Sequence, residues 1–266
     1  MELNYPNHII LDDIGTWPTQ ISNLLTEVES NIHKYRTREL EIDNAAKSNV
    51  LLRYQRPINE YNSYWSDAIS RIKYFINESM IVGFHCSRLT NDEIASVRQN
   101  GLLPLAYEYT IRRIDIIKKA GLISPIVAQE LIEKNESRAQ NRNGNVCFFH
   151  ALRTLKDDVG LYRLFRAWGG EAIYLNHENN QQVFQEIIKI GTPCIVVASL
   201  QPEEVGFFND IAPRIINTWL DRNALTEYSQ DCDTIVKREV SVLEIIDRDD
   251  PRFEELTDCT NWYYKI

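Results

Sequence analysis

The stretch 81–101, IVGFHCSRLTNDEIASVRQNG, predicts a buried strand followed by a turn and a capped helix. Its apolar beginning has the length and composition of a short buried strand, and His85 stands near the end of that strand. Thr90 and Glu93 have the spacing of a capping box, in which two side chains satisfy free backbone N–H groups at a helix start. The closing glycine is the residue type that most often ends a helix. We therefore expect His85 at the end of a strand, directly before a turn and a helix.

Short strands and helices follow one another through the rest of the chain. Residues 14 to about 80 are helix-rich, with apolar side chains at helical spacing. The pattern predicts an α+β fold with an N-terminal helical extension, 1–80, and a core, 81–266. Helices are expected between the strands of this core. Its further strands are predicted at 146–149, 171–175, 194–200 and 235–246.

The composition is that of an ordinary globular protein, and it limits the classes of partner. Of the 266 residues, 44% are hydrophobic and 25% are charged. The net charge of −9 disfavours nonspecific binding to duplex nucleic acid, although a local basic cleft would still hold such a substrate. No apolar run approaches the roughly 20 residues that span a bilayer. The first residues also lack the basic and apolar regions of a secretory signal. We therefore expect a cytoplasmic protein with no membrane partner.

Five cysteines are scattered along the chain, mostly in apolar segments. An odd number without paired spacing argues against a disulfide framework and favours reduced, buried thiols. Cys147 and His150, together with His85 and Cys86, are the candidate zinc ligands, but positions three apart on a strand point to opposite faces. The sequence contains no phosphate loop, dinucleotide-binding fingerprint or Gly-x-Ser-x-Gly elbow. We expect no bound metal.

Two polar residues stand on predicted strands where a catalytic role is conceivable. His85 shares a strand face with Gly83 and Ser87, and it is either a hydrogen-bonded structural residue or a catalytic one. In the predicted strand 235–246, alternation places Glu239 on the face opposite the valines. Glu239 therefore faces either solvent or a cleft. Residue type and spacing alone leave both alternatives open.

Three short motifs resemble those of the ADP-ribosyltransferase superfamily, in the same order. His85-Cys86-Ser87, followed by a helix that ends at Gly101-Leu102, resembles the first motif. The aromatic strand Cys147-Phe148-Phe149 resembles the second, with Phe where Tyr is commoner. Lys237-Arg238-Glu239-Val240 resembles the third. The order His, aromatic, Glu is that of the diphtheria-toxin-like and poly(ADP-ribose) polymerase-like branch, and the similarity covers roughly 81–258. It is also similar to bacterial toxins and phage-defence enzymes that ADP-ribosylate nucleic acid.

The resemblance implies an ADP-ribosyltransferase-like split β-sheet core with inserted helices, and NAD as substrate. By this resemblance, His85 forms a hydrogen bond to a ribose of NAD, and the neighbouring backbone binds the amide group of the nicotinamide. A phenylalanine of the second motif stacks on the nicotinamide, and Glu239 stabilises the oxocarbenium-like transition state. Arg88 either contacts the pyrophosphate or forms a surface ion pair. The positions so assigned to NAD and its chemistry are His85, Cys86, Ser87, Arg88, Phe148, Phe149 and Glu239.

The segment 162–174, YRLFRAWGGEAIY, lies outside the superfamily motifs. It looks like the signature of a narrower bacterial group, in which Glu171 is a second functional carboxylate. Alternatively, it is an amphipathic helix that stops at two glycines before a core strand.

The expected activity is transfer of ADP-ribose to a macromolecule, with RNA or DNA slightly ahead of protein as the acceptor. By the same resemblance, the protein is a toxin or phage-defence effector. An antitoxin-like or chaperone-like partner would restrain it through the N-terminal helices. A noncatalytic binding protein with the same fold and a hydrolytic NAD glycohydrolase are the alternatives.

Overall fold

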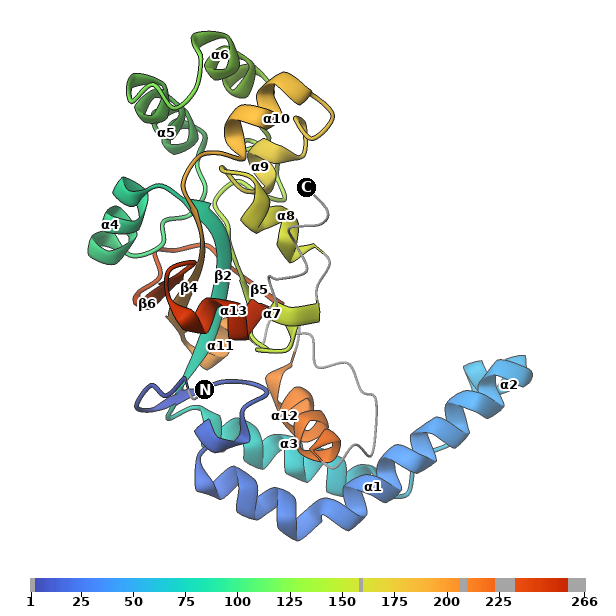
Figure 1. Cartoon of the computed structure of the whole chain (residues 1–266). Helices are drawn as coiled ribbons and strands as arrows, with labels where there is room; N and C mark the ends of the chain where they lie inside the picture. The colour runs from blue at the N-terminus through green and yellow to red at the C-terminus, as the bar shows by residue number, and fades with distance from the viewer. Residues whose placement is uncertain (1–2, 158–159, 206–209, 223–232, 258–266) are drawn as a thin grey trace.

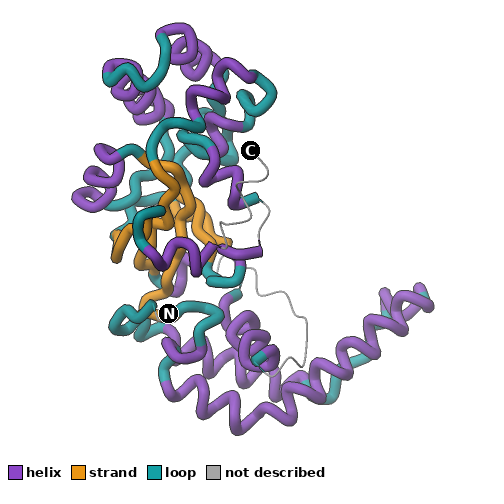
Figure 2. Tube along the Cα trace, in the orientation of Figure 1, coloured by secondary structure: helices purple, strands orange, loops and turns teal. Residues whose placement is uncertain are grey.

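The computed structural model describes residues 3–157, 160–205, 210–222 and 233–257. As predicted, the fold is α+β. Figure 2 shows the strands gathered in the middle of the molecule, with helices toward both ends. In Figure 1 one group of helices lies around α5, α6 and α10, and the other lies around α1 and α3. The candidate site belongs to the region where the sheet meets the first of these groups.

Within the described residues the sheet has six strands, and β2 is the longest of them. The strand order is β5-β3-β2-β4-β6, with β1 added in parallel to β2 and all other pairs antiparallel. The strand bounds are β1 His8–Ile9, β2 Met80–Leu89, β3 Val146–Phe149, β4 Thr192–Leu200, β5 Asp233–Val236 and β6 Val242–Asp247.

The two neighbours of β2 pair with it very differently. With β4, the register runs without interruption from Ile81↔Leu200 to Leu89↔Thr192. With β3, the register consists of one position, Phe84↔Phe149. Strands β2 and β3 therefore diverge directly after Phe84, and the sheet is split beside His85.

The continuous strand predicted at 235–246 is wrong. Strand β5 ends at Val236 on one edge of the sheet and β6 begins at Val242 beyond β4, so the chain crosses the end of the sheet between them. Val240 forms an isolated bridge with Leu102 on this crossing. Alternation of apolar residues in the sequence therefore does not determine the direction of side chains on the crossing.

The strand predicted at 171–175 is also wrong, because Glu171–Tyr174 is a short helix, α9. Gly170 precedes it with a φ of 66°, a conformation that side-chain-bearing residues rarely adopt. Ile173 and Tyr174 are buried in a hydrophobic cluster with residues of neighbouring helices and not in the sheet. A four-residue apolar run fits either element by pattern, and here tertiary packing decides between them.

The N-terminal helices form a layer that shares one hydrophobic core with the sheet. A later helix, α12, packs against α1 and α3 and joins this layer (Figure 1). No helix in the described part of the chain has both the length and the apolar character needed to cross a bilayer. The bounds in this layer are η1 Ile14–Thr16, α1 Thr19–Ser48, α2 Val50–Tyr54, α3 Asn62–Ile76 and α12 Ile211–Asp221.

Helix α4 confirms the predicted start and stop signals. Thr90 and Glu93 form the expected capping box of α4, and Gly101 ends that helix with a φ of 75°. Ser124 caps α6 and is followed by a proline in the first turn. The bounds are α4 Asn91–Asn100, α5 Tyr107–Lys119, α6 Pro125–Glu133, α7 Thr154–Asp157, α8 Leu161–Arg166, α10 Gln181–Ile187, α11 Pro202–Val205 and α13 Pro251–Thr257.

Candidate functional site

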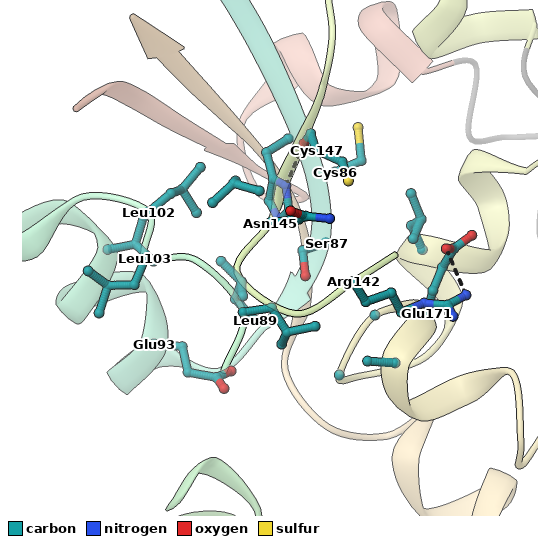
Figure 3. Close-up of a pocket in the computed structure, with 18 of the residues that line it drawn as sticks. Cys86, Ser87, Leu89, Glu93, Leu102, Leu103, Arg142, Asn145, Cys147 and Glu171 are labelled. Carbon is teal, nitrogen blue, oxygen red and sulfur yellow. Dashed lines mark hydrogen bonds and ion pairs between the residues drawn. The ribbon is translucent and has the colours of Figure 1, made fainter. Parts of the chain in front are cut away.

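A pocket of about 290 Å³ lies beside the second half of β2, where β3 has diverged from it (Figure 3). This volume is at the lower end of the range for small-molecule sites, roughly 300–1,000 Å³. His85 and Ser87 line it from one face of β2, and Cys86 lines it from the other. Both faces contribute because no strand is paired with β2 on that side. The pocket therefore occupies the split in the sheet.

His85 is fixed across the split by one hydrogen bond. Its Nδ1 lies 2.9 Å from the carbonyl oxygen of Cys147 on β3. Since a carbonyl oxygen only accepts, Nδ1 carries the hydrogen and Nε2 is the acceptor atom of the neutral ring. Burial lowers the pKa of His85, the Cys147 carbonyl opposes this effect, and the charge of Arg113 adds to it. The site therefore holds a neutral imidazole at pH 7.

One wall of the pocket is a buried ion pair, Glu93 with Arg113. Arg113 Nε lies 2.6 Å from Glu93 Oε1, and both side chains are only 13% exposed. Trp168 Nε1 donates to Glu93 Oε2 at 3.0 Å, and the Arg113 guanidinium lies 4.8 Å from the centre of the Trp168 ring. Burial opposes ionisation of Glu93, but Arg113 and the Thr90 and Trp168 donors outweigh it, so its pKa is lowered. This pair therefore joins α4 and α5 to Trp168, which lies in the turn after residues 161–166.

The opposite wall contains a second, looser ion pair. Arg142 Nη2 lies 3.4 Å from Glu171 Oε2, and both residues line the pocket (Figure 3). Arg142 Nη1 also donates to Glu136. Asn145 lines the pocket nearby, and its buried Oδ1 has no hydrogen-bond partner among the described residues. This wall offers a cation, a carboxylate and an amide oxygen.

The two phenylalanines of β3 face different surroundings. Phe149 lines the pocket. Phe148 is 1% exposed and belongs to the hydrophobic core, where its ring meets His85 edge to face with centroids 6.1 Å apart. Phe149 is therefore the phenylalanine placed to stack on a ligand, and Phe148 supports the imidazole.

Arg88 is not among the described residues that line the pocket. Its guanidinium donates to the backbone carbonyls of Ile190 at 2.6 Å and Phe165 at 3.2 Å. Burial lowers its pKa. Arg88 therefore ties β2 to the end of α8 and to the residues before β4.

Glu239 lies on the crossing between β5 and β6 and is exposed. Its neighbour Val240 pairs with Leu102, which lines the pocket, and Gly101 approaches both Val240 and the Glu239 side chain. Glu239 itself is not one of the described pocket-lining residues. The structure thus brings His85 and Glu171 to one pocket and places Glu239 beside its Leu102 wall.

His150, one of the candidate zinc ligands, uses both of its ring nitrogens in hydrogen bonds within the protein. His150 is buried, with Nδ1 2.7 Å from the Val82 carbonyl oxygen and Nε2 2.9 Å from the Thr234 hydroxyl. In the described ranges, no group of three or more His, Cys, Asp or Glu side chains is arranged to hold a metal ion. Cys86, Cys147 and Cys194 are free thiols, whereas Cys232 and Cys259 lie outside the described residues.

Sequence reasoning missed Arg142, Asn145, Glu93 and Arg113 as pocket residues. Arg142 and Asn145 had a usable signal, since they stand in the polar loop that leads directly into β3. Glu93 was recognised through its capping role alone. Comparisons of the chain with protein-family models, with curated proteins and with solved structures find no match. Function is therefore inferred from the residues of the pocket.

Proposed function

We propose that this protein is an ADP-ribosyltransferase that binds NAD in the split of its sheet and transfers ADP-ribose to a macromolecule. One observation carries the proposal: β2 and β3 part directly after Phe84, and a pocket opens there beside the His85-Cys86-Ser87 motif. A sheet split at this motif is what an ADP-ribosyltransferase-like core would require.

The pocket's residues suit the two ends of a nicotinamide riboside. Leu89, Leu102 and Leu105 supply an apolar wall, and Phe149 supplies a ring to stack on the nicotinamide. The neutral His85 offers Nε2 as an acceptor for a ribose hydroxyl. The remaining polar groups are left for the charged part of the dinucleotide.

The reaction breaks the bond between ribose C1′ and the nicotinamide nitrogen, which leaves with the bonding electron pair. The acceptor's nucleophile then forms a bond to C1′ and gives up its proton. Positive charge builds on the ribose in between, and a carboxylate near it lowers the barrier most effectively where water is excluded. Pocket geometry favours Glu171 for this role, whereas the family resemblance favours Glu239.

The nature of the acceptor follows from the resemblance and stays part of the proposal. RNA or DNA is placed slightly ahead of protein, and an antitoxin-like or chaperone-like regulator would control the activity. NAD hydrolysis without transfer and noncatalytic NAD binding are the two competing functions.

Purified protein incubated with NAD labelled in its adenylate group, together with separate RNA, DNA and protein fractions, tests the proposal. Label on one fraction with equimolar nicotinamide release supports transfer. Nicotinamide release without label transfer indicates a glycohydrolase. Binding without release indicates a binding protein, and neither binding nor release would end the proposal.

Two matched variants then identify the carboxylate. Loss of one electrostatic stabiliser costs roughly a hundredfold or more in turnover. We expect that loss in Glu171→Gln if the carboxylate that lines the pocket stabilises the transition state. We expect it in Glu239→Gln if the carboxylate indicated by the family resemblance does so. Glu133→Gln, on the exposed end of α6, is the control. Unchanged nicotinamide release in both test variants would remove a carboxylate from the mechanism.

A further inference from the structure

One of the two pocket arginines, Arg142, has a buried Nε without a hydrogen-bond partner among the described residues and only one long ion-pair contact within the pocket lining. Among the described lining residues, Arg113 and Arg142 carry the only permanent positive charges. Arg113 is held at 2.6 Å by Glu93 and lies against Trp168. Glu93 is itself buried beside Arg113, whereas Glu171, the pocket-lining partner of Arg142, is exposed, so an anionic part of a ligand would displace a carboxylate more readily from Arg142.

The contacts of Arg142 are unequal. Nη1 is held by Glu136 outside the pocket lining, and the arginine side chain is only 17% exposed. Nη2 lies 3.4 Å from Glu171, which is longer than the roughly 2.7–2.9 Å of a good charge-assisted hydrogen bond. Nε is buried and has no hydrogen-bond partner among the described residues. One edge of the guanidinium is therefore anchored, and the other is under-used.

Glu171 is the more exposed member of the pair. Its side chain is 54% exposed, against 17% for Arg142. It lies on the short helix α9, directly after Gly170. An exposed carboxylate with one long contact loses little when it turns away from the arginine, because such ion pairs contribute about 0–1 kcal/mol. A stronger anion would displace it without moving the arginine.

We infer that Arg142 is the pyrophosphate-binding residue of this pocket and that Glu171 is its counter-ion in the unliganded protein. The inference rests on the proposed function, which supplies a dinucleotide as the ligand. A guanidinium binds paired phosphate oxygens through two parallel N–H donors, and here Nε and Nη2 form that edge. Binding would also release Glu171 from Arg142, and the nearby Asn145 Oδ1 would accept a ribose hydroxyl. The role first assigned to Arg88 thereby moves to a residue that lines the pocket.

Calorimetric titration with ADP-ribose, adenosine and inorganic pyrophosphate tests the inference. We expect Arg142→Gln to weaken ADP-ribose binding at least tenfold and to leave adenosine affinity within twofold. Arg142→Lys keeps the charge but loses the paired donors, and we expect an intermediate affinity. Glu171→Gln should bind ADP-ribose severalfold more tightly, since the competing anion is gone. Arg138→Gln, four residues away and outside the described pocket lining, is the control.

The outcomes separate this inference from the proposed function. If wild-type protein binds ADP-ribose and Arg142→Gln binds it equally well, Arg142 is not the phosphate site, although the proposed function survives. Equal weakening for ADP-ribose and adenosine would assign Arg142 a structural role and overturn the inference too. If wild-type protein binds neither NAD nor ADP-ribose, the proposed function fails. In that case, pyrophosphate binding that is lost in Arg142→Gln would still support an anion site at Arg142. If the wild-type protein does not bind pyrophosphate either, the anion site is refuted.

Should Arg142→Gln fail to fold, which circular dichroism would reveal, Glu171→Gln decides alone. Weaker or unchanged ADP-ribose binding in that variant contradicts the inference. A second readout comes from Cys147, an exposed pocket-lining thiol. ADP-ribose should slow its modification by a thiol reagent, as followed by mass spectrometry of the Cys147 peptide.

Discussion

Acidification should destabilise this protein through one buried imidazole, His150. Nδ1 donates a hydrogen bond to the Val82 carbonyl oxygen at 2.7 Å. Nε2 of the neutral ring therefore accepts a hydrogen bond from the Thr234 hydroxyl, 2.9 Å away. Protonation would give Nε2 a hydrogen and remove this acceptor, within a site that is 0% exposed. Burial lowers the pKa of His150 from its ordinary 6.5 to about 4, and the Val82 carbonyl only partly opposes this effect.

The sign and the size follow from the two pKa values. Between pH 6.5 and about 4 the unfolded chain binds a proton at His150 that the folded chain does not, so stability falls as the pH falls. The full difference corresponds to about 3 kcal/mol, at about 1.4 kcal/mol per pH unit. Roughly 2 kcal/mol of it should be lost between pH 7 and pH 4.5.

Urea unfolding followed by tryptophan fluorescence at several pH values measures this loss. His150→Asn is the matched variant, because its amide can donate to Val82 in place of Nδ1 and does not titrate. Wild-type stability should exceed that of the variant at pH 7, and the gap should shrink by roughly 2 kcal/mol at pH 4.5. A gap that stays constant with pH would refute the assignment of a neutral, buried His150.

Two further substitutions probe the pocket walls. Glu93→Gln should lower the free energy of unfolding by about 3 kcal/mol, since it leaves the buried Arg113 charge without its partner. Urea unfolding measures this, with Glu133→Gln as the control variant. A loss of less than about 1 kcal/mol would contradict a tight ion pair. His85→Ala should weaken NAD binding in calorimetry, and so should His85→Asn, although its amide can still donate to the Cys147 carbonyl. Wild-type affinity in His85→Asn would show that the imidazole matters for strand spacing alone.

Local signals in the sequence predicted the elements that depend on local chemistry. The capping box of α4 was found where predicted. The strand that carries His85 was also found, but it continues to Leu89, so His85 lies within β2 and not at its end. The two wrong elements are an apolar run at 171–175 and an apolar alternation at 235–246, and the structure of both depends on distant partners. No periodicity within 235–246 encodes that its two halves pair with β3 and β4, on opposite sides of β2.

The same distinction applies to the site. His85, Cys86 and Ser87 were identified because they are contiguous, and all three line the pocket. The wall formed by Arg142 and Glu171 joins a loop to a helix 29 residues later. No regular spacing in the sequence predicts a contact between residues so far apart. Which of Phe148 and Phe149 lines the pocket depends on where β3 diverges from β2. These features require the folded chain.

His85 contributes to the existence of the pocket as well as to its chemistry. Continued beyond Phe84↔Phe149, an antiparallel ladder would pair the backbone of β3 with that of β2 and fill the split. Instead, the Cys147 carbonyl oxygen accepts from the His85 side chain, so the strands are held apart by the length of an imidazole. Phe148 packs against the same ring from the core. A residue that satisfies a β3 carbonyl across an open gap lets the sheet split without leaving that acceptor unpaired, and the pocket opens in this gap.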